Sequence, residues 1–172
     1  MIPTPGQTVG PFFGYALPFD DDNRLVPLGA PGAVRLGGRV LDGDGDPVPD
    51  AVLELWQTDP EGRVVQQPGS LLREGYGFTG WGRTSTDREG RWSFTTVRPG
   101  SSFFAITVLA RGLLHRLFTR AYLPDAADDA FLLALPADRR STLLTTEGEG
   151  GYVFDVRLQG DGETVFLTFP RG

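Results

Sequence analysis

One arginine at the end of an apolar run is the first residue in this chain whose position suggests chemistry. Residues 103–110 are rich in aromatic and β-branched side chains and too few to span a membrane, so they predict a central β-strand. Arg111 follows, with Gly112 behind it, at the point where that strand leaves the core. A guanidinium there is either a solvated edge charge or a clamp for an anionic ligand. The run alone leaves both interpretations open.

Metal chemistry is restricted by the residue types. The chain contains a single histidine, His115, and no cysteine. A mononuclear iron or zinc site generally needs at least two imidazoles, or one imidazole together with several anionic ligands. A two-histidine site therefore cannot be built from this chain alone, and we expect it to hold no metal.

Three aspartates at alternate positions, Asp42, Asp44 and Asp46, resemble the start of an EF-hand loop. The twelfth position of such a loop would be Leu53 instead of glutamate, and Pro47 interrupts the pattern. The segment is better interpreted as a turn between two strands.

Composition excludes several classes of function. The chain has 172 residues and a formal net charge of −6, without a run of basic residues, which argues against nucleic acid or an anionic membrane as a partner. No segment has the length and apolarity of a membrane span, and the first ten residues lack the features of a signal peptide. We expect a soluble, cytoplasmic protein, and the absence of cysteine agrees with a reducing compartment. A metal-independent enzyme finds no support, because neither a Ser-His-Asp arrangement nor an evident carboxylate pair is present.

The 24 glycines and 14 prolines are typical of short strands joined by tight turns. Alternating or apolar runs predict strands over 34–42, 51–58, 80–86, 90–97, 103–110 and 117–123, and a terminal hairpin around Gln-Gly-Asp-Gly within 151–169. Residues 125–135 and 136–144 are the helix-like segments. We therefore predict an all-β fold over one domain, residues 1–172. It is a two-sheet β-sandwich of about eight strands, with a short helical insertion near 125–145 and an extended N-terminal arm over 1–16.

The arm carries three aromatic residues in four positions, namely Phe12, Phe13 and Tyr15. Prolines at 3, 5 and 11 and glycines at 6, 10 and 14 lead us to expect no helix there. The aromatic side chains need a surface to cover them, which is either the body of this domain or another chain.

Seven short motifs, taken in order, resemble the intradiol ring-cleaving dioxygenases over nearly the whole chain. They are Thr4-Pro-x-Gln-Thr-x-Gly-Pro11, Leu55-Trp-Gln-Thr-Asp59, Gly80-Trp-Gly-Arg-Thr84, Thr96-Val-Arg-Pro-Gly100, Ala110-Arg-Gly112, Thr119-Arg120 and Tyr152-x-Phe-Asp-Val-Arg-Leu-Gln-Gly160. Ala-Arg-Gly and the terminal block point to the alpha type of subunit in that family.

The resemblance implies a hetero-oligomer of alternating alpha and beta subunits, with Fe(III) held by two tyrosinates and two histidines of the beta subunit. At the corresponding positions this chain has Val64, the shortened loop Ser101-Ser102, Phe103 and Ala105. All four ligands are missing, so the resemblance, like the histidine count, implies that iron belongs to the partner.

The resemblance also implies that Thr8, Gly10 and Pro11 line a substrate pocket formed with the beta subunit, and that Arg111 approaches the same pocket. The implied reaction is the cleavage of 3,4-dihydroxybenzoate (protocatechuate) by O2, which gives 3-carboxy-cis,cis-muconate. A carboxylate on the substrate suits a permanently charged guanidinium, and Gly10 would permit close approach to a flat ring.

A second hypothesis is a non-catalytic binding module. The pattern Gly45-Asp-Pro-Val-x-x-Ala-x-Leu-Glu-Leu-Trp56 is similar to that of transthyretin-like β-sandwiches, which bind ligands or proteins without catalysis. Such a module would be a colourless monomer that ignores an iron-bearing partner.

Overall fold

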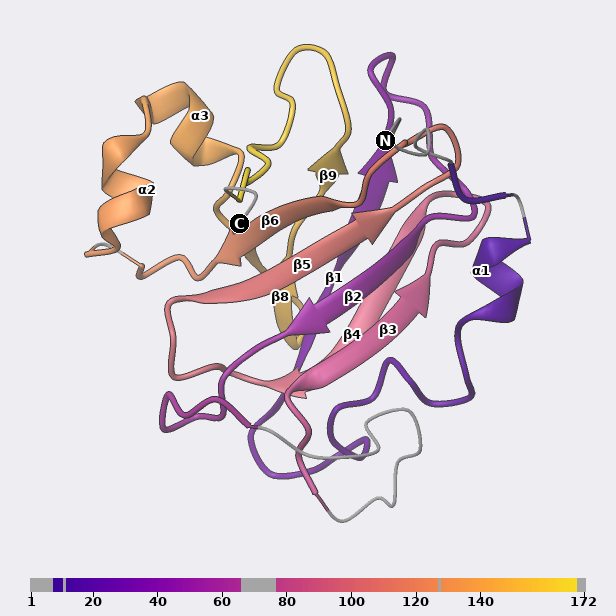
Figure 1. The fold of residues 1–172 in the computed structure, drawn as a ribbon. Coiled ribbons are helices and arrows are strands. Elements are labelled where there is room, and N and C mark those ends of the chain that lie inside the picture. Colours follow the sequence, from indigo (N-terminus) through magenta and orange to yellow (C-terminus); the bar gives the residue numbers. More distant parts are fainter. Residues whose placement is uncertain (1–7, 11, 66–76, 127, 170–172) are drawn as a thin grey trace, which may run out of the picture.

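Two β-sheets packed face to face form the body of the computed structural model, which describes residues 8–10, 12–65, 77–126 and 128–169 (Figure 1). The first sheet has the order β4-β1-β8-β7, with β9 also paired to β1. Its strands are β1 (Ala33–Leu41), β4 (Arg91–Val97), β7 (Thr146–Gly148), β8 (Gly151–Val153) and β9 (Val156–Arg157). The second has the order β3-β2-β5-β6, made by β2 (Val52–Trp56), β3 (Trp81–Ser85), β5 (Phe103–Leu109) and β6 (Leu117–Tyr122). The predicted all-β sandwich is confirmed.

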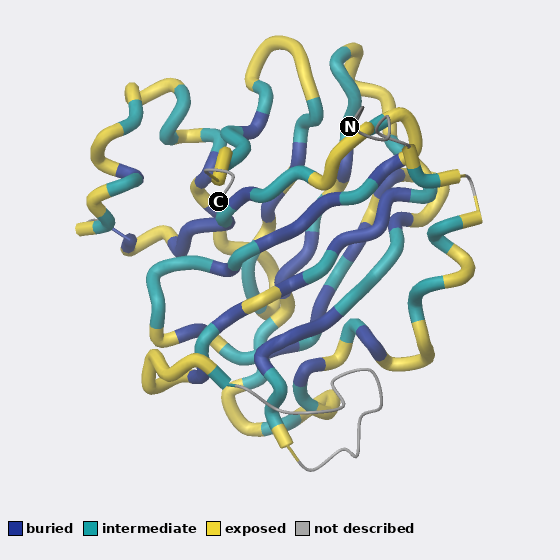
Figure 2. The backbone as a smooth tube through the Cα atoms, viewed as in Figure 1, coloured by how far each residue is buried: buried dark blue, intermediate teal, exposed yellow. Residues whose placement is uncertain are grey.

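The core lies between the two sheets and follows the period of two expected of strands with one buried face. In β4 the buried residues are Trp92, Phe94 and Thr96, and in β5 Phe104, Ile106 and Val108 come from the opposite sheet. Figure 2 shows the buried stretches running along the strands, whereas most loops at the rim are exposed. This packing fixes which side chains of each strand point outward, and the candidate site is built from those.

The helical insertion lies where the sequence predicts it, between β6 and β7 (Figure 1, orange). It consists of α2 (Ala130–Ala134), whose N-cap Asp129 accepts a hydrogen bond from the Leu132 amide, and α3 (Ala137–Ser141), whose N-cap is Pro136. Within the residues that the structure describes, no helix has the length and apolarity needed to cross a membrane.

The arm differs from its prediction, because Phe13–Ala16 form one short helical turn, α1. The amide of Ala16 donates to the Phe12 carbonyl and that of Leu17 to the Phe13 carbonyl, at 3.1 and 3.3 Å. The exclusion of a helix was wrong because a proline immediately before the first turn does not oppose a helix, and one glycine weakens a turn without preventing it.

The second run of the expected terminal hairpin, 163–169, forms no strand. It turns back after residue 162, where the Thr164 amide donates to the Arg157 carbonyl at 3.0 Å, and then follows β6. There the Leu167 amide donates to the Phe118 carbonyl at 2.7 Å, and the Thr119 hydroxyl donates to the Val165 carbonyl at 2.9 Å. The segment thus bonds to β9 at Thr164 and to the edge strand β6 from Val165 onward.

Candidate functional site

The N-terminal arm meets the turn between β5 and β6, which unites two of the predicted pocket segments. The amide of Gly112 donates a 2.7 Å hydrogen bond to the Thr8 hydroxyl oxygen, across 104 positions of sequence. Gly112 has a φ of +92°, so its left-handed conformation closes the turn directly after Arg111. Thr8 is therefore held beside the segment that carries Arg111.

The other predicted pocket residues leave this surface open. Arg111 is exposed and forms no ion pair or side-chain hydrogen bond within the described part of the chain. Gly10 is exposed as well, and a Cβ added to it would meet nothing within 4 Å. Pro11 lies outside the described residues. Nothing in the described chain therefore explains why position 10 lacks a side chain.

Three aromatic side chains in the arm and just after it are largely exposed, whereas Phe13 is half-buried. The exposed fractions of Phe12, Tyr15 and Phe19 are 77%, 80% and 55%, and α1 contains no buried residue. Exposed aromatic side chains grouped on one short segment are characteristic of an interaction surface.

The base of the arm is tied to the outer face of the second sheet by an ion pair that the sequence analysis did not single out. Glu54 on β2 and Arg83 on β3 are cross-strand partners, and their side chains approach to 2.6 Å. The Arg83 guanidinium also donates to the Leu17 carbonyl at 3.2 Å and lies 5.1 Å from the Trp81 ring centroid. One arginine thus joins two strands to the segment that follows α1.

The four positions that the motif resemblance assigns to metal ligands carry no donors suited to iron. Val64 is 71% exposed, and Phe103 and Ala105 offer only carbon atoms. The Ser101 hydroxyl donates to the Phe103 carbonyl at 3.0 Å and accepts from Thr58 at 3.2 Å, so it is engaged within the protein. No group of three or more histidine, cysteine, aspartate or glutamate side chains that could hold a metal occurs among the described residues.

A cation of the protein itself, the Arg120 guanidinium, lies over the ring of Phe103. The Arg120 guanidinium lies 4.2 Å from the Phe103 ring centroid and 5.6 Å from that of Phe131, and it donates to the Tyr122 hydroxyl at 3.0 Å. Tyr122 in turn donates to the Asp129 carboxylate at 3.0 Å. Burial and the Asp129 hydrogen bond both raise the pKa of Tyr122, which keeps the phenol neutral. A fixed guanidinium among carbon atoms and a neutral phenol does not fit a ferric ion.

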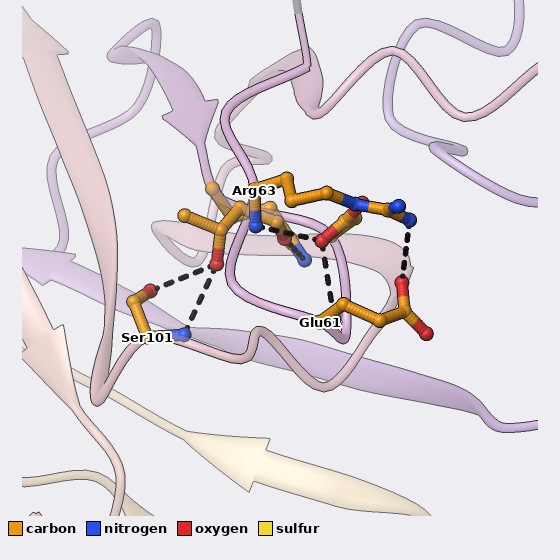
Figure 3. Close-up of polar contacts among 6 residues, drawn as sticks. Glu61, Arg63 and Ser101 are labelled. Atoms are coloured by element: carbon orange, nitrogen blue, oxygen red, sulfur yellow. Dashed lines mark hydrogen bonds and ion pairs between the residues drawn. The ribbon is translucent and has the colours of Figure 1, made fainter.

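The loop that ends at Val64 is held rigidly by its own polar contacts. Figure 3 shows Arg63 paired with Glu61 at 3.0 Å, with Ser101 on the neighbouring turn. The Arg63 guanidinium also contacts the buried Asp59 carboxylate at 2.7 Å, and that carboxylate accepts from the amides of Glu61 and Arg63. Burial acts to raise the pKa of Asp59, but the hydrogen bonds from Arg63 and the Glu61 amide outweigh it and lower the pKa.

We expect Asp59→Asn to lower the Tm of the chain at pH 7 by weakening this loop. Because the pKa of Asp59 is lower in the folded chain than in the unfolded one, its charge stabilises the fold at neutral pH, and that contribution is lost as the pH falls below about 4. The Tm difference between the two proteins should therefore shrink in thermal scans as the pH falls toward about 3. A difference that is constant across this range would contradict the assignment.

Comparison with known proteins shows to which family this chain belongs. Residues 8–126 match the family model described as Dioxygenase, and the chain is 40% identical, over 95% of its length and 96% of the relative's, to the protocatechuate 3,4-dioxygenase alpha chain of Burkholderia cepacia. The chain belongs to the intradiol dioxygenase family. The beta chain from the same organism is also a relative, with 32% identity over 86% of this chain and 74% of its own length. The alpha and the beta chain of the Burkholderia cepacia enzyme are thus both relatives of this chain.

A solved structure supports the fold of this intradiol dioxygenase chain independently. The dioxygenase domain of a dioxygenase and carbohydrate-binding protein fusion from Streptomyces sp. SirexAA-E superimposes with a TM-score of 0.59, covering 91% of this chain and 99% of that domain. At 21% identity this likeness concerns the fold alone. The resemblance inferred from the seven motifs is thus confirmed at the level of the family.

The sequence analysis missed Arg120 and the Glu54–Arg83 pair as residues of interest. Arg120 was part of a quoted motif, and the alternation of residues 117–123 places it on the same face of β6 as Phe118 and Tyr122. That pattern predicts a shared face. The neighbours of Arg120 on β5 and α2 can be identified only once the pairing of β5 with β6 is known.

Proposed function

We propose that this chain is the alpha subunit, without iron, of a protocatechuate 3,4-dioxygenase. With an iron-bearing beta subunit it cleaves 3,4-dihydroxybenzoate with O2 to 3-carboxy-cis,cis-muconate. One observation carries the proposal: a chain 40% identical to a protocatechuate 3,4-dioxygenase alpha chain has Val64, Phe103 and Ala105 at positions that the motif resemblance assigns to metal ligands. Such a chain contributes to catalysis through a partner's site. We also place the complex in the cytoplasm, with which the absence of cysteine is compatible.

In this proposal the chain's own residues form one wall of the substrate pocket. Thr8 is held against Gly112, which brings the arm and Arg111 to one edge of the molecule. Gly10 allows the flat ring to approach the backbone, and Pro11 stiffens the same wall. The permanently charged Arg111 guanidinium holds the carboxylate of the substrate through charge-assisted hydrogen bonds. These residues bind, orient and exclude water, and the metal chemistry belongs to the partner.

The exposed aromatic arm supplies part of the interface. Phe12, Tyr15 and Phe19 present apolar area that the described body of the chain leaves uncovered, and a permanent complex commonly buries more than about 2,000 Å² in total. Burial of these side chains by the beta subunit would also order the arm over the shared pocket.

Co-expression with a beta chain tests the proposal directly. We expect the two chains to copurify as a complex with the visible absorption of tyrosinate-bound iron and with O2 uptake that depends on protocatechuate, whereas the isolated chain has neither. A colourless monomer that ignores the beta chain would refute the proposal and favour a transthyretin-like binding module.

Replacement of Arg111 tests the pocket within the active complex. Arg111→Ala should lower kcat/KM for protocatechuate about tenfold, equivalent to about 1.4 kcal/mol, without changing the iron content. Arg39→Ala is a matched control, because Arg39 is also exposed and forms no ion pair with any residue that the structure describes, but it lies on β1 of the other sheet. Equal kinetics for Arg111→Ala and the unmodified complex would show that Arg111 is only an edge charge.

A further inference from the structure

We propose that Arg116 and His115 extend Arg111 into an electrostatic guide that selects carboxylate-bearing catechols over catechols that lack a carboxylate. This inference deepens the proposed function and rests on it. The three side chains lie within six residues, on the turn that joins β5 to β6, which we call the basic tip (residues 110–116).

Arg116 is held in place by aromatic rings. Its guanidinium lies 5.2 Å from the Phe118 ring centroid, and Phe118 is itself packed edge-on against Phe169 at 5.2 Å. Arg116 precedes the first residue of β6, and Phe118 follows two positions later on the same face of the strand. A stacked guanidinium loses less freedom when it meets an anion than a free side chain would, because its position is already restricted.

The guanidinium charges of the basic tip, those of Arg111 and Arg116, are uncompensated within the described residues. Arg111, His115 and Arg116 are exposed, and none of them forms an ion pair or a side-chain hydrogen bond in the portion of the chain that the structure describes. By contrast, five other arginines are paired with carboxylates: Arg24, Arg63, Arg83, Arg91 and Arg98.

The basic tip is a local region of positive charge on a chain whose net charge is negative. The formal net charge is −6, so an approaching carboxylate meets a repulsive average field and is drawn to a local cluster of positive charge. The contact between Thr8 and Gly112 places the arm against this same turn. Arg116 and His115 therefore stand beside the proposed pocket wall and widen the region from which an anionic substrate is captured.

The ligand class follows from this arrangement. Protocatechuate carries a carboxylate beside its two phenolic hydroxyls, whereas catechol carries none and is not attracted by the basic tip. Ring opening adds two further carboxylates, so the same charges act on the product as it leaves. Attraction of this kind acts through solvent and weakens as salt shortens the screening length from about 30 Å at 10 mM to about 3 Å at 1 M.

The experiment compares two substrates at two salt concentrations, using the complex of this chain with its beta subunit. In the double variant His115→Gln, Arg116→Gln, we expect kcat/KM for protocatechuate to fall about threefold to tenfold at about 10 mM salt, and the difference to vanish near 1 M. The value for catechol should stay unchanged under both conditions. The single variant Arg116→Lys should show little of this fall in kcat/KM for protocatechuate, because lysine keeps the positive charge.

One control variant tests whether the loss of any surface charge lowers kcat/KM, and copurification of the beta chain tests whether the complex still assembles. Arg39→Gln removes an exposed positive charge from the other sheet and should leave both substrates unaffected. Unchanged kcat/KM for protocatechuate at low salt would overturn the inference, and so would an equal fall for catechol or a loss of copurified beta chain. In the first two cases an active complex of the unmodified chains would still support the proposed function.

Discussion

Glu54→Ala is expected to lower the free energy of unfolding of this chain by about 3 to 5 kcal/mol, because it leaves the charge of Arg83 without a partner. Only 14% of the Arg83 side chain is exposed, and its Nη2 lies 2.6 Å from a carboxylate oxygen of Glu54. The guanidinium donates to that same oxygen through Nε at 3.1 Å, so removal of Glu54 abolishes two charge-assisted hydrogen bonds. Urea unfolding followed by circular dichroism measures the difference.

Two further variants identify the cause of this loss. Arg83→Met in the Glu54→Leu background removes both charges and should recover much of the stability, because no buried charge remains unpaired. Disruption of the exposed pair between Arg24 and Asp21 by Arg24→Ala should change stability by less than about 1 kcal/mol. If Glu54→Ala lowered the free energy of unfolding as little as Arg24→Ala, solvent would be stabilising the Arg83 charge and the buried ion pair would contribute little to stability.

Gly100→Ala is the second substitution with a large expected effect, a loss of about 1 to 3 kcal/mol from overpacking. A Cβ at this position would lie 2.3 Å from the Gly62 nitrogen and 2.5 Å from the Pro60 carbonyl oxygen, and neither backbone atom can rotate away. The Gly100 amide donates to the Asp59 carbonyl at 2.8 Å, so the loop and the turn would have to separate. Thermal unfolding should show a lower Tm.

Gly10→Ala is the matched control for this glycine. Nothing lies within 4 Å of the added Cβ, so the stability of the isolated chain should not change beyond about 0.5 kcal/mol. In the complex with the beta subunit we expect the same substitution to raise KM for protocatechuate, because the proposed pocket requires close approach to the backbone. If Gly100→Ala lowers stability and Gly10→Ala raises only KM, the first glycine is needed for folding and the second for substrate binding. Equal stability of Gly100→Ala and Gly10→Ala would contradict the packing described here.

Local sequence patterns were enough to predict most of the fold. The alternation in residues 90–97 and the apolar run in 103–110 correspond to β4 and β5, because a strand buried on one face repeats every two residues. The turn after β1 was also predicted correctly, since Asp42 accepts hydrogen bonds from the amides of Asp44 and Asp46 as a turn aspartate does. Each of these depends on neighbours within a few residues.

Apart from the short helix α1, the features that sequence could not supply depend on contacts between distant segments. The hydrogen bond between Thr8 and Gly112 joins residues 104 positions apart, and no local pattern encodes it. The run 163–169 has the alternation of a strand, yet it follows the edge of β6 because that edge was open. The count of histidines was enough to predict that a two-histidine site is missing, whereas the contact of Arg120 with Phe103 required the register between β5 and β6.

The position of Arg120 also has a consequence for protein engineering. A designer who wished to graft a second ferric centre onto this subunit would begin with Phe103→His and Ala105→His and add the two tyrosines. The two histidines would stand beside the Arg120 guanidinium, which lies 4.2 Å from the Phe103 ring centroid and would repel a metal cation bound there. Such a design would therefore have to replace Arg120 first, together with the Tyr122 and Asp129 contacts that hold its side chain in place.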